Sequence, residues 1–386
     1  MNPIAVAASF YDEINELAPS IEDNRRMPQS LADKMAAAGL FRLLVPQQYG
    51  GIECSPATFF DSLVTTAYAD GAVGWCTMIA NTTALLSASL PSPWAQTIYG
   101  DHPNIITVGV TAPMGRANIE HNNGSAELRV SGRWPFGSGS QIADWICGGC
   151  TIYENGEQKL NEHGQPETTL VFFPANEVTI HDDTWDTFGL KGSGSHDIEV
   201  IDQLVPQGRW VTLGGRANVD SALYRFPTLG LLALGVSAVS IGIAQRAVDE
   251  FIALAGGKTP TGSNRTLANR PMVQKDLAQA QARLASARAL TNQTIESAWQ
   301  QANAQGKLSI DTKADLRLAA ANNAWSAVEV VDKLFHAAGG TAIYSKSKLQ
   351  QCFRDVHVPT QHIMVGQPIF EVVGRVMLGM PLKQML

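Results

Sequence analysis

Two polar side chains stand in stretches whose residue types could carry proton or hydrogen-bond chemistry. Ser138 lies in the run Ser131-Gly-Arg-Trp-Pro-Phe-Gly-Ser-Gly-Ser140, and His362 lies in the later stretch Thr360-Gln-His362. A serine hydroxyl both donates and accepts hydrogen bonds. An imidazole with an ordinary pKa of about 6.5 exchanges protons at neutral pH. By residue type alone, a turn role for Ser138 and a structural role for His362 stay open.

A second candidate is a helical face formed by Trp75, Met78, Asn81 and Thr82, which recur at spacings of three to four residues. These side chains could line a pocket or belong to the core. We expect Trp75 and Asn81 to belong to a substrate pocket, and a lining of this kind favours a flat aromatic substrate over a sugar.

The cysteines do not indicate a metal site. Cys147-Gly-Gly-Cys150 has the spacing of a zinc or redox pair, but its neighbours are strand-like and no second pair of ligands stands nearby. We therefore predict no metal. Scattered cysteines favour a reducing compartment, and thus a cytoplasmic protein.

The elements that must position these residues fall into three parts, which predict an α+β fold. Residues 1–103 show helical periodicity, residues 104–225 hold short β-type runs separated by turns, and residues 226–386 are helical again. We expect an N-terminal helical domain, a central antiparallel β-barrel or sandwich, and a C-terminal four-helix bundle that makes the oligomer contacts.

Composition limits the partners. Charged residues make up 16% of 386 residues, against a usual share of about 25%, which indicates surface buried in an oligomer. A net charge of −7 argues against binding to nucleic acid or to an anionic membrane. The uncharged stretch 228–244 is short for a membrane span, so we expect a buried bundle helix. The first twenty residues do not resemble a signal peptide.

The chain resembles the acyl-CoA dehydrogenase superfamily, which has this three-domain order. The segments that carry the resemblance are Leu31-Ala-Asp-Lys-Met-Ala-Ala-Ala-Gly-Leu40 with Val45-Pro-Gln-Gln-Tyr-Gly-Gly51, Phe188-Gly-Leu-Lys-Gly-Ser-Gly-Ser195, Leu334-Phe-His-Ala-Ala-Gly-Gly340 and Leu349-Gln-Gln-Cys-Phe-Arg-Asp355. Arg354 and Asp355 are expected to form a structural ion pair.

Two departures from the dehydrogenase pattern indicate which branch of the superfamily the chain resembles. Many dehydrogenases of the superfamily place a catalytic glutamate where this chain has Ile363, which cannot accept a proton. The Gly-Arg-Trp-x-Phe-x-Ser-Gly string around Ser138, combined with His362, is similar to the oxygenase components of two-component flavin monooxygenases. That branch hydroxylates phenols, indoles or steroid-derived phenols, or amino sugars at nitrogen.

The resemblance implies a mechanism and partners. A separate NAD(P)H:flavin reductase would supply reduced flavin, FADH2 or FMNH2, and O2 would add to it as a flavin hydroperoxide that hydroxylates a small aromatic or heteroaromatic substrate. Ser138 would hydrogen-bond the flavin ring, and His362 would hold or take a proton. The other implied flavin contacts are Trp134, Phe136, Gly137, Gly139, Lys191, Gly192, Ser193, Gly339 and Gly340.

The superfamily assembles as a homotetramer, in which Gly339 and Gly340 would reach a neighbour's flavin. Three alternatives stay open: a dehydrogenase-like flavoprotein with a displaced base, an amino-sugar N-oxygenase, and a non-catalytic assembly protein that has kept the fold.

Overall fold

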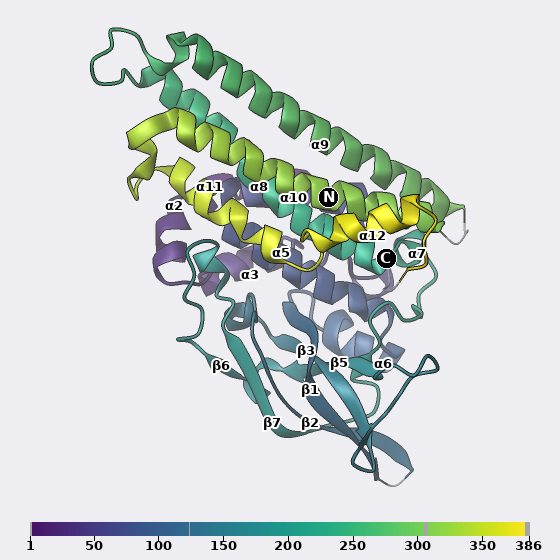
Figure 1. Cartoon of the computed structure of the whole chain (residues 1–386). Helices are drawn as coiled ribbons and strands as arrows, with labels where there is room; N and C mark the ends of the chain where they lie inside the picture. Colours follow the sequence, from purple (N-terminus) through teal and green to yellow (C-terminus); the bar gives the residue numbers. More distant parts are fainter. Residues whose placement is uncertain (1, 123, 305–307, 383–386) are drawn as a thin grey trace.

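The computed structural model describes residues 2–122, 124–304 and 308–382. The N-terminal part is helical (Figure 1), with α1 (Pro3–Ser9), α2 (Tyr11–Asp23), α3 (Gln29–Ala37), α4 (Pro56–Ala69), α5 (Gly71–Ala84) and α6 (Ser92–Ala95). Side-chain caps fix two of the helix starts. Ser55 accepts from the Thr58 amide before α4, and Asp70 accepts from the Ala72 and Val73 amides before α5.

The central part is one eight-stranded sheet. Its strands are β1 (Thr107–Asn122), β2 (Ser125–Trp134), β3 (Trp145–Glu154), β4 (Glu157–Gln158), β5 (Thr168–Pro174), β6 (Thr179–His181), β7 (Asp197–Val205) and β8 (Trp210–Val211). The order is β6-β7-β2-β1-β3-β5-β8, with β4 paired to β3. The pairs are antiparallel as predicted, except that β1 and β3 run parallel.

Cys147 and Cys150 both lie in β3, as their strand-like neighbours predicted. Successive strand residues face opposite sides, so residues three apart lie on opposite faces of the sheet. Cys147 packs in the cluster of Phe172, and Cys150 packs in the cluster of Trp134. All five cysteines are buried free thiols.

The C-terminal part is built from α7 (Ala222–Arg225), α8 (Thr228–Gly257), α9 (Pro271–Asn303), α10 (Ile310–Ala338), α11 (Lys348–His357) and α12 (Pro368–Met377). The helices α8, α9 and α10 are long, and α11 and α12 follow one another along α10 (Figure 1). We had expected four long helices. The fourth position is divided because Pro359 and Pro368, which lack a backbone donor, interrupt the helical ladder.

Helix α8 is long and apolar enough to cross a membrane, but 83% of its most apolar 18-residue segment is buried inside the fold. It packs closely on α4, where a Cβ at Gly242 would lie 2.5 Å from the Val64 carbonyl oxygen. This contact identifies the uncharged stretch as the core helix of the bundle, as predicted.

Helix α5 lies between the two halves of the molecule. Trp75 and Met78 pack with the α4 and α8 core, whereas Val73, Cys76 and Ala80 pack with the core that α1 to α3 share with the sheet. Trp75 is therefore held at the junction of the β domain and the bundle.

Candidate functional site

A chain of three buried serine hydroxyls lies at this junction. The Oγ atoms of Ser193 and Ser195 are 2.7 Å apart, and those of Ser195 and Ser138 are 2.6 Å apart. The indole Nε1 of Trp75 donates to the Ser138 Oγ at 3.0 Å. Ser138 thus joins the loop after β2, the loop before β7 and helix α5.

Backbone contacts hold the two loops together. The Gly137 amide donates to the His196 carbonyl oxygen, and the Gly139 amide donates to the Ser193 carbonyl oxygen at 3.0 Å. A Cβ at Gly137 would lie 2.8 Å from the His196 carbonyl oxygen, so only glycine fits there. Gly139 has a φ of 72°, which glycine adopts freely. We predicted cofactor contacts for both glycines, and in the structure Gly137 also allows its loop to approach the loop of His196.

His362 lies on the other side of Trp75. The two rings meet edge to face, with centroids 5.7 Å apart. The Met364 amide donates to the His362 Nδ1 at 3.2 Å. Since this nitrogen is the acceptor, the neutral imidazole carries its proton on Nε2.

The surroundings keep the His362 imidazole neutral. Burial, and to a lesser extent the positive charge of Arg317, lower its pKa to about 4. An ordinary imidazole has a pKa near 6.5. With the lower value, His362 is a weak base at neutral pH and a hydrogen-bond donor through Nε2.

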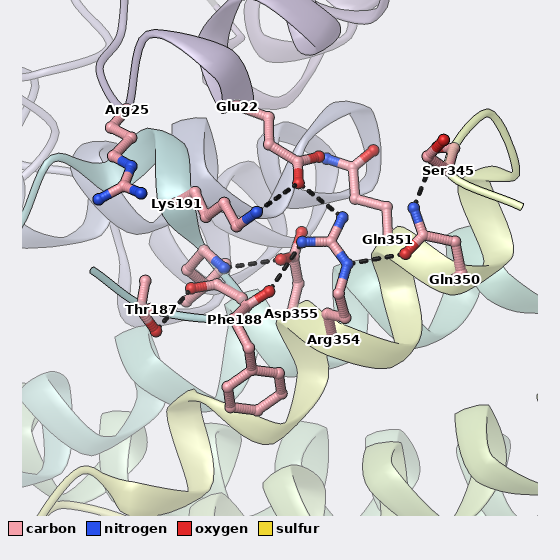
Figure 2. Close-up of polar contacts among 12 residues, drawn as sticks. Glu22, Arg25, Thr187, Phe188, Lys191, Ser345, Gln350, Gln351, Arg354 and Asp355 are labelled. Atoms are coloured by element: carbon pink, nitrogen blue, oxygen red, sulfur yellow. Dashed lines mark hydrogen bonds and ion pairs between the residues drawn. The ribbon is translucent and has the colours of Figure 1, made fainter. Parts of the chain in front are cut away.

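Helix α11 ties the parts of the site together (Figure 2). The Asp355 carboxylate accepts from the Leu190 amide at 2.6 Å. In addition, Gln351 donates to Asp70, the cap of α5, at 3.1 Å. Leu190 holds a left-handed backbone with a φ of 48°, which is strained for a side chain of this kind. The Asp355 contact therefore fixes the loop that carries Ser193 and Ser195.

The predicted ion pair between Arg354 and Asp355 is replaced by two separate contacts. Arg354 pairs with Glu22 of α2 at 2.7 Å and donates to the Phe188 carbonyl oxygen at 2.7 Å. Lys191 shares the same Glu22 carboxylate at 3.6 Å, as Figure 2 shows. Both neighbouring side chains of α11 thus hold the 188–191 loop, each by a different backbone atom.

Burial, and next to it the charge of Asp70, raise the pKa of Asp355 to about 7. The pKa of Asp70 is also raised by burial, and its contacts with the α5 amides oppose that shift. Two carboxyl groups are therefore enclosed between α5, α11 and the loop.

Several predicted residues lie outside the hydroxyl chain. Trp134 is 1% exposed in the β-domain core, where its Nε1 donates to the Gly149 carbonyl oxygen. Asn81 is fully buried and accepts from the Leu43 amide while donating to the Leu40 and Thr77 carbonyl oxygens. Its amide joins the helical core and has no remaining donor for a ligand.

The remaining predicted glycines fall in two places. A Cβ at Gly192 would lie 2.2 Å from the Ile21 Cγ2, so this glycine permits the contact between its loop and α2. Gly339 and Gly340 lie exposed just beyond the end of α10. The structure does not bring these residues into the hydroxyl chain.

Sequence reasoning missed two residues of the site. Ser195 ends the segment 188–195 that carries the family resemblance, and the repeat Ser193-Gly-Ser195 was the available signal. Arg317 acts on His362 from α10, and no local pattern around it indicated this. Within the described residues, no cluster of His, Cys, Asp and Glu side chains could hold a metal ion.

Sequence comparison places this architecture in a known group. Models of the acyl-CoA dehydrogenase N-terminal and C-terminal domains match residues 5–90 and 234–367. The chain is 34% identical to indole-3-acetate monooxygenase of Pseudomonas putida, over 92% of this chain and 88% of the relative. It is 27% identical to the flavin-dependent monooxygenase oxygenase subunit HsaA of Mycobacterium tuberculosis, over 93% of this chain and 90% of that one.

A solved structure of the M. tuberculosis HsaA monooxygenase has the same fold, with a TM-score of 0.89 at 24% identity, covering 99% of this chain and 98% of that one. The shared fold is that of the acyl-CoA dehydrogenases. The chain belongs to this superfamily and, within it, to the flavin-dependent monooxygenases.

The residues present fit a flavin. Ser140 Oγ and Trp185 Nε1 are buried and have no hydrogen-bond partner in the part of the chain that the structure describes. Such groups normally meet a ligand or water. Beside them, Phe136 is 65% exposed and meets the Trp185 ring edge to face. A flat ring with polar edges would satisfy both kinds of group.

Proposed function

We propose that this chain is the oxygenase component of a two-component system, which hydroxylates a small indole- or phenol-type substrate. A separate NAD(P)H:flavin reductase supplies it with reduced FAD or FMN. The observation that carries the proposal is the Ser193–Ser195–Ser138 hydroxyl chain, joined by Trp75 to His362. The name of the P. putida relative, which acts on indole-3-acetate, supports an aromatic substrate.

Reduced flavin, when bound, supplies the electrons that activate O2. The role of the protein is then to hold hydrogen-bond donors in place and to exclude water. Ser138 is only 4% exposed. Trp75 donates to the Ser138 Oγ. We propose that Ser193 donates to Ser195 and that Ser195 donates to Ser138 when the ligand is bound, so that both lone pairs of Ser138 are filled. Its single proton is then directed to the ligand.

His362 acts as a second donor. Because its Nδ1 accepts from the Met364 amide, its Nε2 proton is available to an oxygen atom near Trp75. Because its pKa is lowered, His362 does not take a second proton at neutral pH and stays a neutral donor through Nε2. We propose that it stabilises negative charge that develops on the oxygen of the reactant or substrate.

The oligomer is a homotetramer in this proposal. Large apolar side chains are exposed on the bundle, and a second copy would cover them. They are Ile252, Met272, Leu290, Ile310, Ile343, Tyr344, Met377 and Leu378. Gly339 and Gly340, next to this surface, would contact a neighbour's flavin. The buried free thiols support a cytoplasmic location.

The test supplies reduced flavin from a separate reductase under ¹⁸O2, with indole, phenol and their acetate derivatives as a substrate panel. The proposal predicts one labelled oxygen atom in the product for each O2 consumed. A firmly bound yellow flavin that bleaches on adding an acyl-CoA, with no oxygenated product, would instead show a dehydrogenase. Protein that binds neither oxidised nor reduced flavin would favour a non-catalytic role.

A further inference from the structure

Arg317 is a buried cation on the bundle side of the site. It projects from α10 and is 4% exposed. Its Nη2 donates to the Met364 carbonyl oxygen at 3.3 Å, and its Nε is buried with no partner among the described residues. A guanidinium has five donor hydrogens, so most of its hydrogen-bonding capacity is unused.

The charge of Arg317 is also uncompensated. Burial lowers its pKa to about 10, and among the described residues no carboxylate opposes this shift, so the group stays charged at neutral pH. Among the described residues, the other buried arginines are better satisfied. Arg246 pairs with Glu250 at 2.8 Å and Arg209 pairs with Glu177 at 3.6 Å. Arg42 has no acidic partner, but its guanidinium donates to four backbone carbonyl oxygens, those of Tyr49, Tyr99, His102 and Pro103. A buried charge without a partner is costly, and proteins normally neutralise it.

The position of the guanidinium indicates which anion would neutralise it. Arg317 contacts the turn that presents His362, and its charge acts on that imidazole. The Trp75 ring lies on His362. An aromatic ring bound against Trp75 and His362 would have a basic group on its bundle side, away from the serines of the β domain.

We propose that Arg317 binds the carboxylate of the substrate, which makes the preferred substrate an aromatic carboxylic acid. This inference rests on the proposed hydroxylase function and narrows its substrate class. Guanidinium and carboxylate form paired, charge-assisted hydrogen bonds, and the free Nε and Nη donors of Arg317 match that geometry. The protein would bind the acid more tightly than a neutral analogue, because the analogue leaves the buried cation unpaired.

The experiment compares acids with their isosteric amides. Binding of indole-3-acetate and indole-3-acetamide, and of 4-hydroxyphenylacetate and its amide, is titrated anaerobically with reduced flavin present. The variants are R317M, R317K and the control R283M. Arg283 pairs with exposed Glu329 on the surface of the same bundle, so R283M removes the same charge from a place outside the site.

The inference predicts that the wild-type protein binds at least one acid about 10-fold or more tightly than its amide. In R317M the acid loses about 10- to 100-fold in affinity, the amide changes by less than about 3-fold, and R317K retains part of the preference. R283M keeps the wild-type values. Reduced flavin affinity stays constant, whereas a loss in R317M would show that the flavin itself is the anion and would overturn the inference.

Two further results would overturn it. One is wild-type protein that binds neither acid more tightly than its amide. The other is R317M in which acid and amide lose affinity in parallel, because Arg317 would then only position the Met364 turn. Failure of the hydroxylase proposal is distinguishable, since acid-selective binding would persist without any oxygenated product.

Discussion

Two substitutions of Asp355 separate the contribution of its hydrogen bond to folding stability from that of its charge. D355A removes both, and D355N removes the charge alone. In D355A the Leu190 amide loses an acceptor at 2.6 Å and stays buried, which costs about 1–3 kcal/mol of folding stability. The strained Leu190 backbone also loses its restraint. In D355N the amide oxygen still accepts from Leu190, and the buried charge next to Asp70 is gone. We therefore expect D355N to be more stable than D355A.

The raised pKa of Asp355 predicts how the folding stability changes with pH. The pKa of Asp355 is raised to about 7 in the folded protein, against about 3.9 in an unfolded chain. Between these values the folded state holds a proton that the unfolded state releases, so stability falls as pH rises from about 4 to 7. Three pKa units correspond to at most about 4 kcal/mol. D355N should remove most of this slope.

The assay is urea unfolding of wild type, D355N and D355A at pH 5, 6, 7 and 8, at one protein concentration. Product formed per O2 consumed is measured in parallel. We expect D355A to lower this ratio, because the loop that bears Ser193 and Ser195 is released. A D355N protein with the wild-type pH slope would refute the charge assignment. Equal stability of D355A and D355N at pH 5 would refute the hydrogen-bond assignment.

Three other perturbations test separate contacts. W75F keeps an aromatic ring beside His362 but removes the donor to Ser138. Hydrogen peroxide release should therefore rise severalfold while the melting temperature shifts little. An unchanged peroxide yield would contradict the donor role of Trp75. G192A places a Cβ 2.2 Å from Ile21 and should lower stability by about 1–3 kcal/mol, measured by urea unfolding, whereas a neutral effect would show that the loop yields easily. Dilution that dissociates the proposed tetramer should weaken reduced-flavin binding, measured by anaerobic titration, and equal affinity in the dissociated form would argue against flavin contacts from Gly339 and Gly340.

The sequence predicted the elements well where one local pattern dominates. Ala280, Leu284, Ala287 and Ile295 recur at helical spacing and are buried along one face of α9, and the uncharged stretch 228–244 lies in the core helix α8 as predicted. These features depend on periodicity and burial, which the chain carries locally.

The site was harder to predict from the sequence, because it depends on contacts between residues that are distant along the chain. Ser138 and His362 were chosen separately, and Trp75, which lies between them, was predicted to line a substrate pocket with a core position as the alternative. Trp134 and Asn81 looked like ligand contacts but satisfy their hydrogen bonds inside the protein. Arg354 and Asp355 are neighbours in sequence, yet α11 directs them to different backbone atoms of one loop. No spacing rule contains that information.

The most direct test of the hydroxyl chain is the amount of product formed per O2 consumed by wild type, S138A and H362A with reduced flavin and an aromatic substrate. If the Ser138 and His362 protons stabilise the reacting oxygen, the ratio is near one in wild type. It should fall well below one in both variants, with hydrogen peroxide accounting for the missing oxygen. An S138A protein that keeps the wild-type ratio would contradict the account.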